Sequence, residues 1–236
     1  MRLDQQPAYV LHARPYRETS LLLECLTRDQ GRLGVVARGV RRERARTPRS
    51  QLEPFQPLAL DLLLRGELAT LVAAESSGAP LRLTGDAGLA GLYLNELVVR
   101  LTGRQDPYPG LFDAYARTLP RLVETAELGW SLRRFERDLL EQLGYGLQLD
   151  AEADSGEPLD TAGWYRYEVE RGPVRCPPGR GHALRGEDLL ALAEDRRPST
   201  QGLAALRMTM REVIRFYLGG GELRAWRVLA GAMTRR

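Results

Sequence analysis

Lysine is absent from this chain, so all 34 of its cationic side chains are arginines. Codon bias in a GC-rich genome is the simplest origin of this composition. The physical consequence is the same whatever the origin, because a guanidinium group is planar, pairs with phosphate through two hydrogen bonds and stacks on bases. A lysine ammonium group does none of these.

Cysteine and long apolar runs are also scarce. Cys25 and Cys176 are too few for a disulfide framework, which favours a cytoplasmic location. The sequence contains no apolar run of about 18 residues, the length that spans a membrane, and its first residues lack the apolar core of a signal peptide. With 236 residues, 43% hydrophobic and 28% charged, we expect a soluble globular protein of one to three domains.

The residue patterns of common enzymes are missing. The sequence has no Walker loop, no GxSxG motif and no dinucleotide-binding fingerprint. His12 falls in an expected strand, and Cys176 and His182 lie among prolines and glycines that favour a surface loop. A zinc site takes about four thiolate or imidazole ligands, which this region does not offer. We therefore expect a binding protein and not an enzyme.

Positive charge is concentrated in one segment. Seven arginines and a single acid, Glu43, lie between Arg32 and Arg49, whereas the whole chain has a net charge of only +3. Such a field predicts a phosphate-bearing partner, although a solvated linker remains the alternative. The candidate nucleic-acid contacts are Arg38, Arg41, Arg42, Arg44, Arg46 and Arg49, with Arg14 and Tyr16 at the adjacent strand end and Tyr9 as a further stacking residue.

Residues 1–79 have the short apolar runs of β-strands. Gly31 and Gly66 stand at turns that join neighbouring runs into hairpins. Five short strands predict a small Greek-key barrel of the OB type, while an open five-stranded sheet or an SH3-like barrel would give nearly the same pattern. The expected strands cover residues 8–13, 20–27, 32–38, 58–64 and 68–74.

From about residue 85 the apolar period becomes helical. Helices are expected near 89–101, 109–122 and 129–143, the first with Leu92 on its buried face. A short hairpin is expected near 164–173, and helices resume at about 186. The last helix carries Arg207, Arg211 and Arg215 at i, i+4 and i+8, either a second nucleic-acid contact or a solvated face. The fold class is multidomain α+β, with domains at 1–79, 80–146, 147–184 and 185–236.

Three groups of segments, in order along the chain, resemble the RecO family of bacterial recombination mediators. The N-terminal group reads ARPYRETSLLL at 13–23, TRDQGRL at 27–33 and VARGVRR at 36–42. The middle segment is LRRFERDLLEQLGYG at 132–146, and the C-terminal one is YLGGGELRAWRVL at 217–229. The resemblance covers essentially the whole chain and implies an N-terminal OB-fold followed by a helical domain.

The resemblance implies a function without covalent chemistry. Members of the family bind single- and double-stranded DNA and anneal complementary strands, including strands coated with single-strand-binding protein. Together with RecR they help RecA to replace that protein on DNA. From the residues alone, a protein-interaction scaffold and an RNA-binding module remain alternatives, because a barrel does not fix a function.

Two further expectations follow from the resemblance. Many members carry a four-cysteine zinc module after the Leu-Gly-Tyr-Gly segment, but only Cys176 remains here, with Glu152, Ser155 and Gly179 near the other positions. We therefore expect no zinc, only a metal-free hairpin. The family also docks the acidic, apolar tail of single-strand-binding protein on its helical domain, for which the candidates are Arg133, Arg134 and Arg137 near Phe135.

Overall fold

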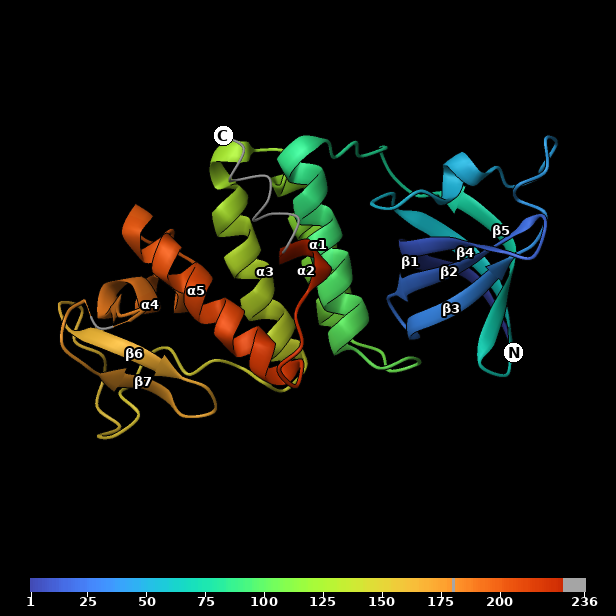
Figure 1. The fold of residues 1–236 in the computed structure, drawn as a ribbon. Helices are drawn as coiled ribbons and strands as arrows, with labels where there is room; N and C mark the ends of the chain where they lie inside the picture. Colours follow the sequence, from blue (N-terminus) through green and yellow to red (C-terminus); the bar gives the residue numbers. More distant parts are fainter. Residues whose placement is uncertain (180, 227–236) are drawn as a thin grey trace. The chain divides into compact units, whose positions relative to one another are not determined.

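The computed structural model of the chain describes residues 1–179 and 181–226 (Figure 1). Its internal contacts divide the chain into two compact units. The first comprises Met1–Thr125 and the described residues from Leu223 onward, and the second comprises Ala126–Glu222. This division differs from the four domains expected from the sequence, whose boundaries remain predictions. The last residues of the segment 217–229 lie outside the described part of the chain.

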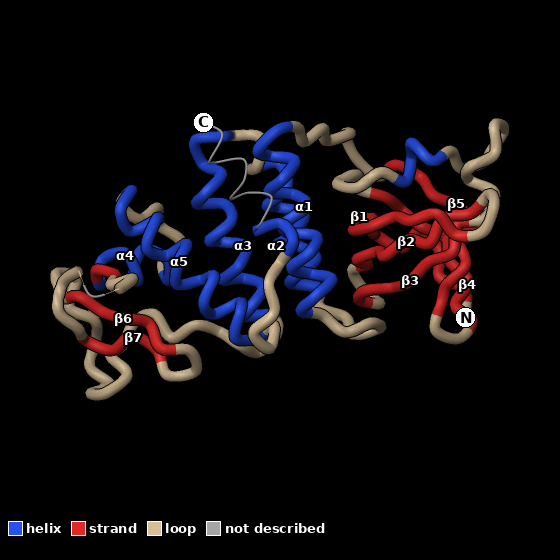
Figure 2. The backbone as a smooth tube through the Cα atoms, viewed as in Figure 1, coloured by secondary structure: helices blue, strands red, loops and turns tan. Residues whose placement is uncertain are grey.

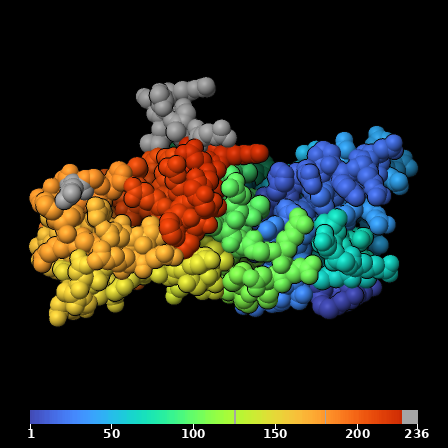
Figure 3. All heavy atoms as spheres, turned by 60° about the horizontal axis from the view of Figure 1, so that its bottom comes forward, coloured from blue at the N-terminus to red at the C-terminus, as the bar shows by residue number. Residues whose placement is uncertain are grey.

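The N-terminal region is a closed five-stranded barrel, which excludes the open sheet among the three expected arrangements. The strands follow the order β1-β2-β3-β5-β4, and β3 and β5 pair in parallel while the other pairs are antiparallel. On the face shown in Figure 3 the barrel residues, coloured blue to teal, form one closely packed surface. The strands are β1 (Arg2–Tyr16), β2 (Ser20–Thr27), β3 (Gly31–Ala37), β4 (Leu58–Arg65) and β5 (Leu68–Ser76).

The first strand is longer than the sequence predicted. β1 has 15 residues, not the expected six, because its first half pairs with β4 and its second half with β2. Two register shifts, between Leu3 and Gln6 and between Val10 and His12, bend the strand so that it serves both neighbours. The first residues of β1 are mostly polar, so the pattern of apolar residues did not predict this extension.

The barrel core also takes in residues from outside the strands. Val40 and Leu52 are only 4% and 1% exposed and pack with the buried strand residues, among them Leu23, Val35 and Leu60. Leu52 ends a short 3-10 helix, η1 (Arg49–Leu52). The segment between β3 and β4 is therefore anchored in the core near both ends of its arginine-rich part.

The rest of the chain is helical apart from a small sheet (Figure 2). The expected hairpin is confirmed, but a third, two-residue strand joins it, and the sheet has the order β7-β6-β8. This strand was too short to predict. The elements are α1 (Gly85–Leu101), α2 (Pro109–Arg121), η2 (Thr125–Glu127), α3 (Leu128–Gln142), β6 (Trp164–Glu168), β7 (Gly172–Arg175), β8 (Leu184–Arg185), α4 (Gly186–Ala193) and α5 (Thr200–Tyr217).

The buried face predicted for α1 is wrong at Leu92. This side chain is 50% exposed, whereas Asn95, three residues further along, is 4% exposed. The Asn95 amide nitrogen donates a 2.8 Å hydrogen bond to the backbone oxygen of Leu11, and the Tyr115 hydroxyl donates one of 2.6 Å to the Asn95 oxygen. Because a buried amide is stable only when its polar atoms are paired, these two partners decide which face of α1 packs inward.

Candidate nucleic-acid interface

The arginine loop, residues 38–49, leads from β3 into η1. It is the tan segment that enters the short blue helix of the barrel in Figure 2. Val40 and Leu52 anchor it in the core, so its backbone is held at both ends. All six of its arginines are exposed to solvent, with Glu43 as its one acid: Arg38, Arg41, Arg42, Arg44, Arg46 and Arg49.

Hydrogen bonds tie the arginine loop to the turn between β1 and β2. The backbone amide of Arg41 donates to the oxygen of Thr19 at 3.1 Å, and its guanidinium Nη1 donates to the oxygen of Glu18 at 3.2 Å. Tyr16 ends β1, two residues before the turn residue Glu18. The half-buried Tyr16 ring carries the guanidinium of Arg17 at 5.3 Å from its centroid.

Arg17 was missed by the sequence analysis. It is exposed and has a φ of 54°, a left-handed conformation that is uncommon for residues other than glycine. The turn therefore presents a cation next to the arginine loop, with Arg14 also exposed on the same strand end. The available signal was its position directly after Tyr16, but a single arginine outside the dense cluster did not stand out.

A concavity of about 330 Å³ is hollowed into the arginine loop. Arg41, Arg42 and Arg49 line it together with apolar atoms of Val40, Ala45 and Pro48, and Glu43 is its only acidic residue. Guanidinium groups that converge on one hollow bind phosphate oxygens through charged hydrogen bonds. The geometry therefore suits an anion more than a cationic or purely apolar ligand.

The seventh arginine of the cluster, Arg32, has a different surrounding. Its side chain is 12% exposed, its Nη1 lies 2.8 Å from a carboxylate oxygen of Glu24, and its Nη2 donates to the oxygen of Thr102 at 2.8 Å. Glu24 also pairs with Arg104. Arg32 is thus largely buried and engaged with groups of its own unit, unlike the six exposed arginines of the loop.

Two other candidates differ in exposure. Tyr9 is 8% exposed and packs against the rings of Phe112 and Tyr115, at centroid distances of 5.4 and 5.1 Å, so its ring is part of the core. On α5, in the second unit, Arg207 and Arg215 are exposed, and Arg211 lies 3.9 Å from Glu222. This stripe and the arginine loop thus belong to different units.

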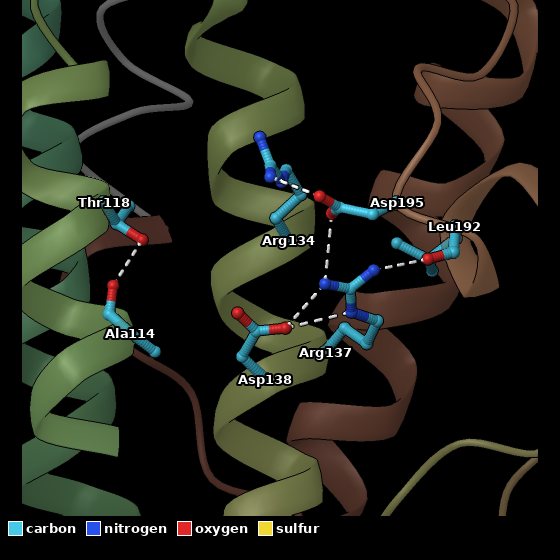
Figure 4. A network of polar contacts seen from close by, with 7 residues as sticks. All are labelled: Ala114, Thr118, Arg134, Arg137, Asp138, Leu192 and Asp195. Carbon is cyan, nitrogen blue, oxygen red and sulfur yellow. Dashed lines mark hydrogen bonds and ion pairs between the residues drawn. The ribbon is translucent and has the colours of Figure 1, made fainter. Parts of the chain in front are cut away.

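The arginines proposed for partner binding lie on α3 and are engaged within the second unit. Arg133 is 5% exposed and forms an ion pair with the fully buried Glu136. Arg134 pairs with Asp195, and Arg137 lies 3.2 Å from the same carboxylate (Figure 4). Of the three, Arg134 and Arg137 therefore belong to the surface network that joins α3 to the end of α4.

A shallow concavity of about 420 Å³ adjoins this network. Leu147, Leu149 and Ala193 give it an apolar part, and its charged lining consists of Arg137, Glu141, Asp150 and Asp195. Arg137 Nη1 also donates a 2.6 Å hydrogen bond to the oxygen of Leu192, which fixes the guanidinium in place. Phe135 is fully buried and does not reach the concavity surface.

The region expected to replace a zinc module is held by hydrogen bonds. The hydroxyl of Tyr165 donates to Glu152 at 2.9 Å, and the hydroxyl of Ser155 donates to the same carboxylate at 3.2 Å. Burial is the main cause of the raised pKa of Tyr165, so the hydroxyl stays protonated as a donor. Within residues 1–179 and 181–226 no three His, Cys, Asp or Glu side chains gather as metal ligands would. The absence of zinc itself stays a prediction.

None of the helices described in the structure combines the length and the apolar character that crossing a membrane requires.

Comparison with known proteins gives matches over the whole chain. The family described as recombination protein O matches with its N-terminal model over residues 1–79 and with its C-terminal model over residues 82–227. Among curated proteins, a DNA repair protein RecO of Stenotrophomonas maltophilia is 45% identical over 240 residues, covering all of both chains. Proteins of the same name from Xanthomonas campestris and Nitrosococcus oceani are 43% and 44% identical, covering 97% and 95% of this chain and 97% and 92% of their own.

Proposed function

This chain belongs to the RecO family of DNA repair proteins, and from that premise we propose that it is a DNA-binding recombination mediator. It binds single- and double-stranded DNA, anneals complementary strands, and helps RecA to load onto DNA coated with single-strand-binding protein. The observation that carries the proposal is the arginine loop. Six exposed arginines with one acid stand on a segment whose ends are anchored in the barrel core.

The physics of annealing fits this surface. Two polyanions must be held close together, and cations that neutralise their phosphates reduce the repulsion between them. Phosphate contacts carry no base information, so one surface can serve any pair of complementary strands. The reaction makes and breaks no covalent bond, which is why the protein is proposed to act without catalytic residues or a cofactor.

The architecture supports the same proposal. The closed barrel is proposed to be an OB-fold, a common platform for single strands, and the three-stranded sheet to be a metal-free counterpart of the zinc module. The DNA contacts would be the six loop arginines with Arg14 and Tyr16. Arg207, Arg211 and Arg215 on α5 would form a second, weaker contact.

Protein partners follow from the family resemblance. RecR and the C-terminal tail of single-strand-binding protein are the proposed direct partners, and RecA the indirect one. An acidic, apolar tail would be recognised by arginines beside an apolar hollow. Arg134 and Arg137 are the proposed contacts on this chain, and an acidic tail would have to displace Asp195 from both of them. The concavity beside Arg137 offers Leu147 and Leu149 to the apolar part of the tail, but its other acids, Glu141 and Asp150, oppose a negative charge there. Such a protein is expected to act in the cytoplasm, at the nucleoid.

The deciding experiment is annealing of two complementary oligonucleotides already coated with the cognate single-strand-binding protein, with and without this protein. Acceleration that depends on the six loop arginines supports the proposal. DNA binding without acceleration would favour a protein-interaction scaffold, and tighter binding to RNA than to DNA would favour an RNA-binding module. Absence of DNA binding at low salt would refute the proposed function.

A further inference from the structure

A second concavity, of about 190 Å³, lies beside the arginine loop in the first unit. Its floor consists of the buried side chains Leu11, Leu21 and Leu52. Pro15, Pro54 and Leu92 complete its apolar lining, and Leu92 is half exposed although it is a large aliphatic residue. The polar groups of the lining are His12, Arg49 and Glu53. The chemistry thus differs from that of the charged hollow within the loop.

The structure holds this concavity open with fixed elements. Asn95 ties α1 to β1 through its 2.8 Å hydrogen bond to the oxygen of Leu11, and Leu92 lies three residues earlier on the same helix. Gly91 allows the ring of Phe55 to approach, since a Cβ atom there would lie 2.8 Å from that ring. The helix and the segment after η1 therefore pack closely, and the floor of the hollow consists of buried side chains.

Arg49 connects the two concavities. It lines both the charged hollow of the loop and the apolar hollow beside α1. Among the described residues its ion-pair partner is Glu53, at 3.7 Å, with 68% and 53% of the two side chains exposed. An exposed ion pair of this kind contributes little to stability, so a phosphate can compete for the guanidinium.

We propose that the apolar concavity binds one unstacked base of a DNA single strand whose phosphates lie on the arginine loop. The inference rests on the proposed function and extends it from phosphate contacts to a base contact. A nucleotide has a charged phosphate and a flat, largely apolar base a short distance apart. The charged hollow and the apolar hollow, which share Arg49 as a lining residue, offer a matching pair of sites. The cavity is also smaller than the roughly 300–1,000 Å³ of pockets for drug-sized ligands, which suits a single base.

The polar rim suits a base edge without selecting one base. The carboxylate of Glu53 accepts hydrogen bonds, and the imidazole of His12 can donate or accept, so several base edges find a partner. A duplex cannot offer an unstacked base without losing stacking and pairing energy. The cavity would therefore favour single strands over duplex, while the arginine loop alone would not distinguish them.

The test compares a thymine oligonucleotide with an abasic strand of the same length and charge. Wild-type protein should bind the thymine strand about fivefold more tightly, at the low end of what one base contact contributes. Leu92→Gln should bring the two affinities close together while leaving the salt dependence unchanged, because no phosphate contact is lost. Val72→Gln is the matched control, since Val72 is an exposed apolar residue of β5, 36% exposed, outside the cavity lining.

A second readout does not depend on overall affinity. The fluorescence of 2-aminopurine in a single strand should rise when its base leaves the stack, and the rise should be smaller with Leu92→Gln than with Val72→Gln. If the thymine and abasic strands bind wild-type protein equally well, the base cavity is refuted while DNA binding stands. If neither strand binds at low salt, the proposed function itself fails.

Discussion

The backbone amide of Arg41 donates a 3.1 Å hydrogen bond to the carbonyl oxygen of Thr19, and this contact joins the arginine loop to the turn between β1 and β2. With Val40 and Leu52 buried in the core, the loop is held from three directions. A charged segment held in this way loses less conformational entropy on binding than a free tail. The arrangement favours a preformed surface for a phosphate backbone.

The salt dependence of DNA binding tests that surface. Replacing Arg41, Arg42 and Arg44 together with glutamine should flatten the slope of log K against log salt by roughly 0.7 per lost contact for single strands, and so by about 2 in all. Fluorescence anisotropy over a salt series measures this slope. The matched control replaces the exposed Arg2, Arg65 and Arg82 of the same unit with glutamine. Equal slopes for both variants would show that only net charge matters.

Replacing Arg17 with glycine should stabilise the protein and weaken its binding to DNA. Its φ of 54° strains any side chain with a Cβ atom, so Arg17→Gly should raise the free energy of unfolding by about 0.5–1 kcal/mol. The same change removes a cation beside Tyr16 and should weaken single-strand binding. Gln105→Gly, at a φ of 58°, is the control that should stabilise without altering affinity. Urea titration and anisotropy measure the two effects, and unchanged affinity in Arg17→Gly would exclude Arg17 from the interface.

The sequence predicts the strands well and their closure poorly. The observed bounds of β2 are those expected, because an apolar run ends at a turn whose last residue is Gly31. Closure of the barrel depends on the parallel pairing of β3 with β5, such as Val35 with Ala69. That pairing joins residues far apart in the chain and leaves no local pattern. The sequence therefore left an open sheet as an alternative.

The candidate site shows the same division. Charge density alone located the arginine loop, but pairing across the fold decided which charges act together. Arg32 pairs with Glu24, and Arg133 is buried against Glu136, neither of which follows from the density of arginines. The error at Leu92 on α1 has a similar cause, since the partners of Asn95 lie on β1 and α2. The spacing of apolar residues does not predict that a polar amide side chain is buried.

The buried ion pair of Arg133 and Glu136 should be essential for the stability of the second unit. Glu136→Gln leaves the guanidinium charge of Arg133 buried and should reduce the free energy of unfolding by about 3–5 kcal/mol. Replacing both residues with leucine should cost much less, because no charge then remains uncompensated. Tryptophan fluorescence, with the buried Trp130 on the same helix, reports this unfolding.

The matched control for that pair is Glu127→Gln. Glu127 pairs with Arg197 at the surface of the same unit, with 33% and 51% of the side chains exposed, so its loss should matter by no more than about 1 kcal/mol. If Glu136→Gln destabilises the protein much more than Glu127→Gln, a partner-binding defect in an Arg133 variant is explained by lost stability and not by a lost contact. If Glu136→Gln reduced the free energy of unfolding as little as Glu127→Gln does, breaking the pair would not leave an uncompensated charge in the protein interior.

Alkaline conditions should weaken the barrel through Cys25. The thiol is fully buried, and burial, with a smaller effect from the charge of Glu24, raises its pKa above its usual range. In the unfolded chain the thiol ionises near pH 8.5, so the folded barrel retains a proton that the unfolded chain releases. The stabilisation is complete below that pH. As pH rises further, the free energy of unfolding should fall by up to about 1 kcal/mol per pH unit.

Urea titrations followed by far-UV circular dichroism between about pH 8 and pH 9 measure this slope, in a range where the tyrosines of the unfolded chain, with an ordinary pKa of about 10, are still mostly protonated. Cys25→Ala should lower stability at every pH because it leaves a cavity in the core, but its curve should be flatter across this window. Cys176→Ala, at the partly exposed cysteine, should keep the wild-type slope. A slope that persists in Cys25→Ala would assign the alkaline sensitivity to another group and refute the role of the buried thiol.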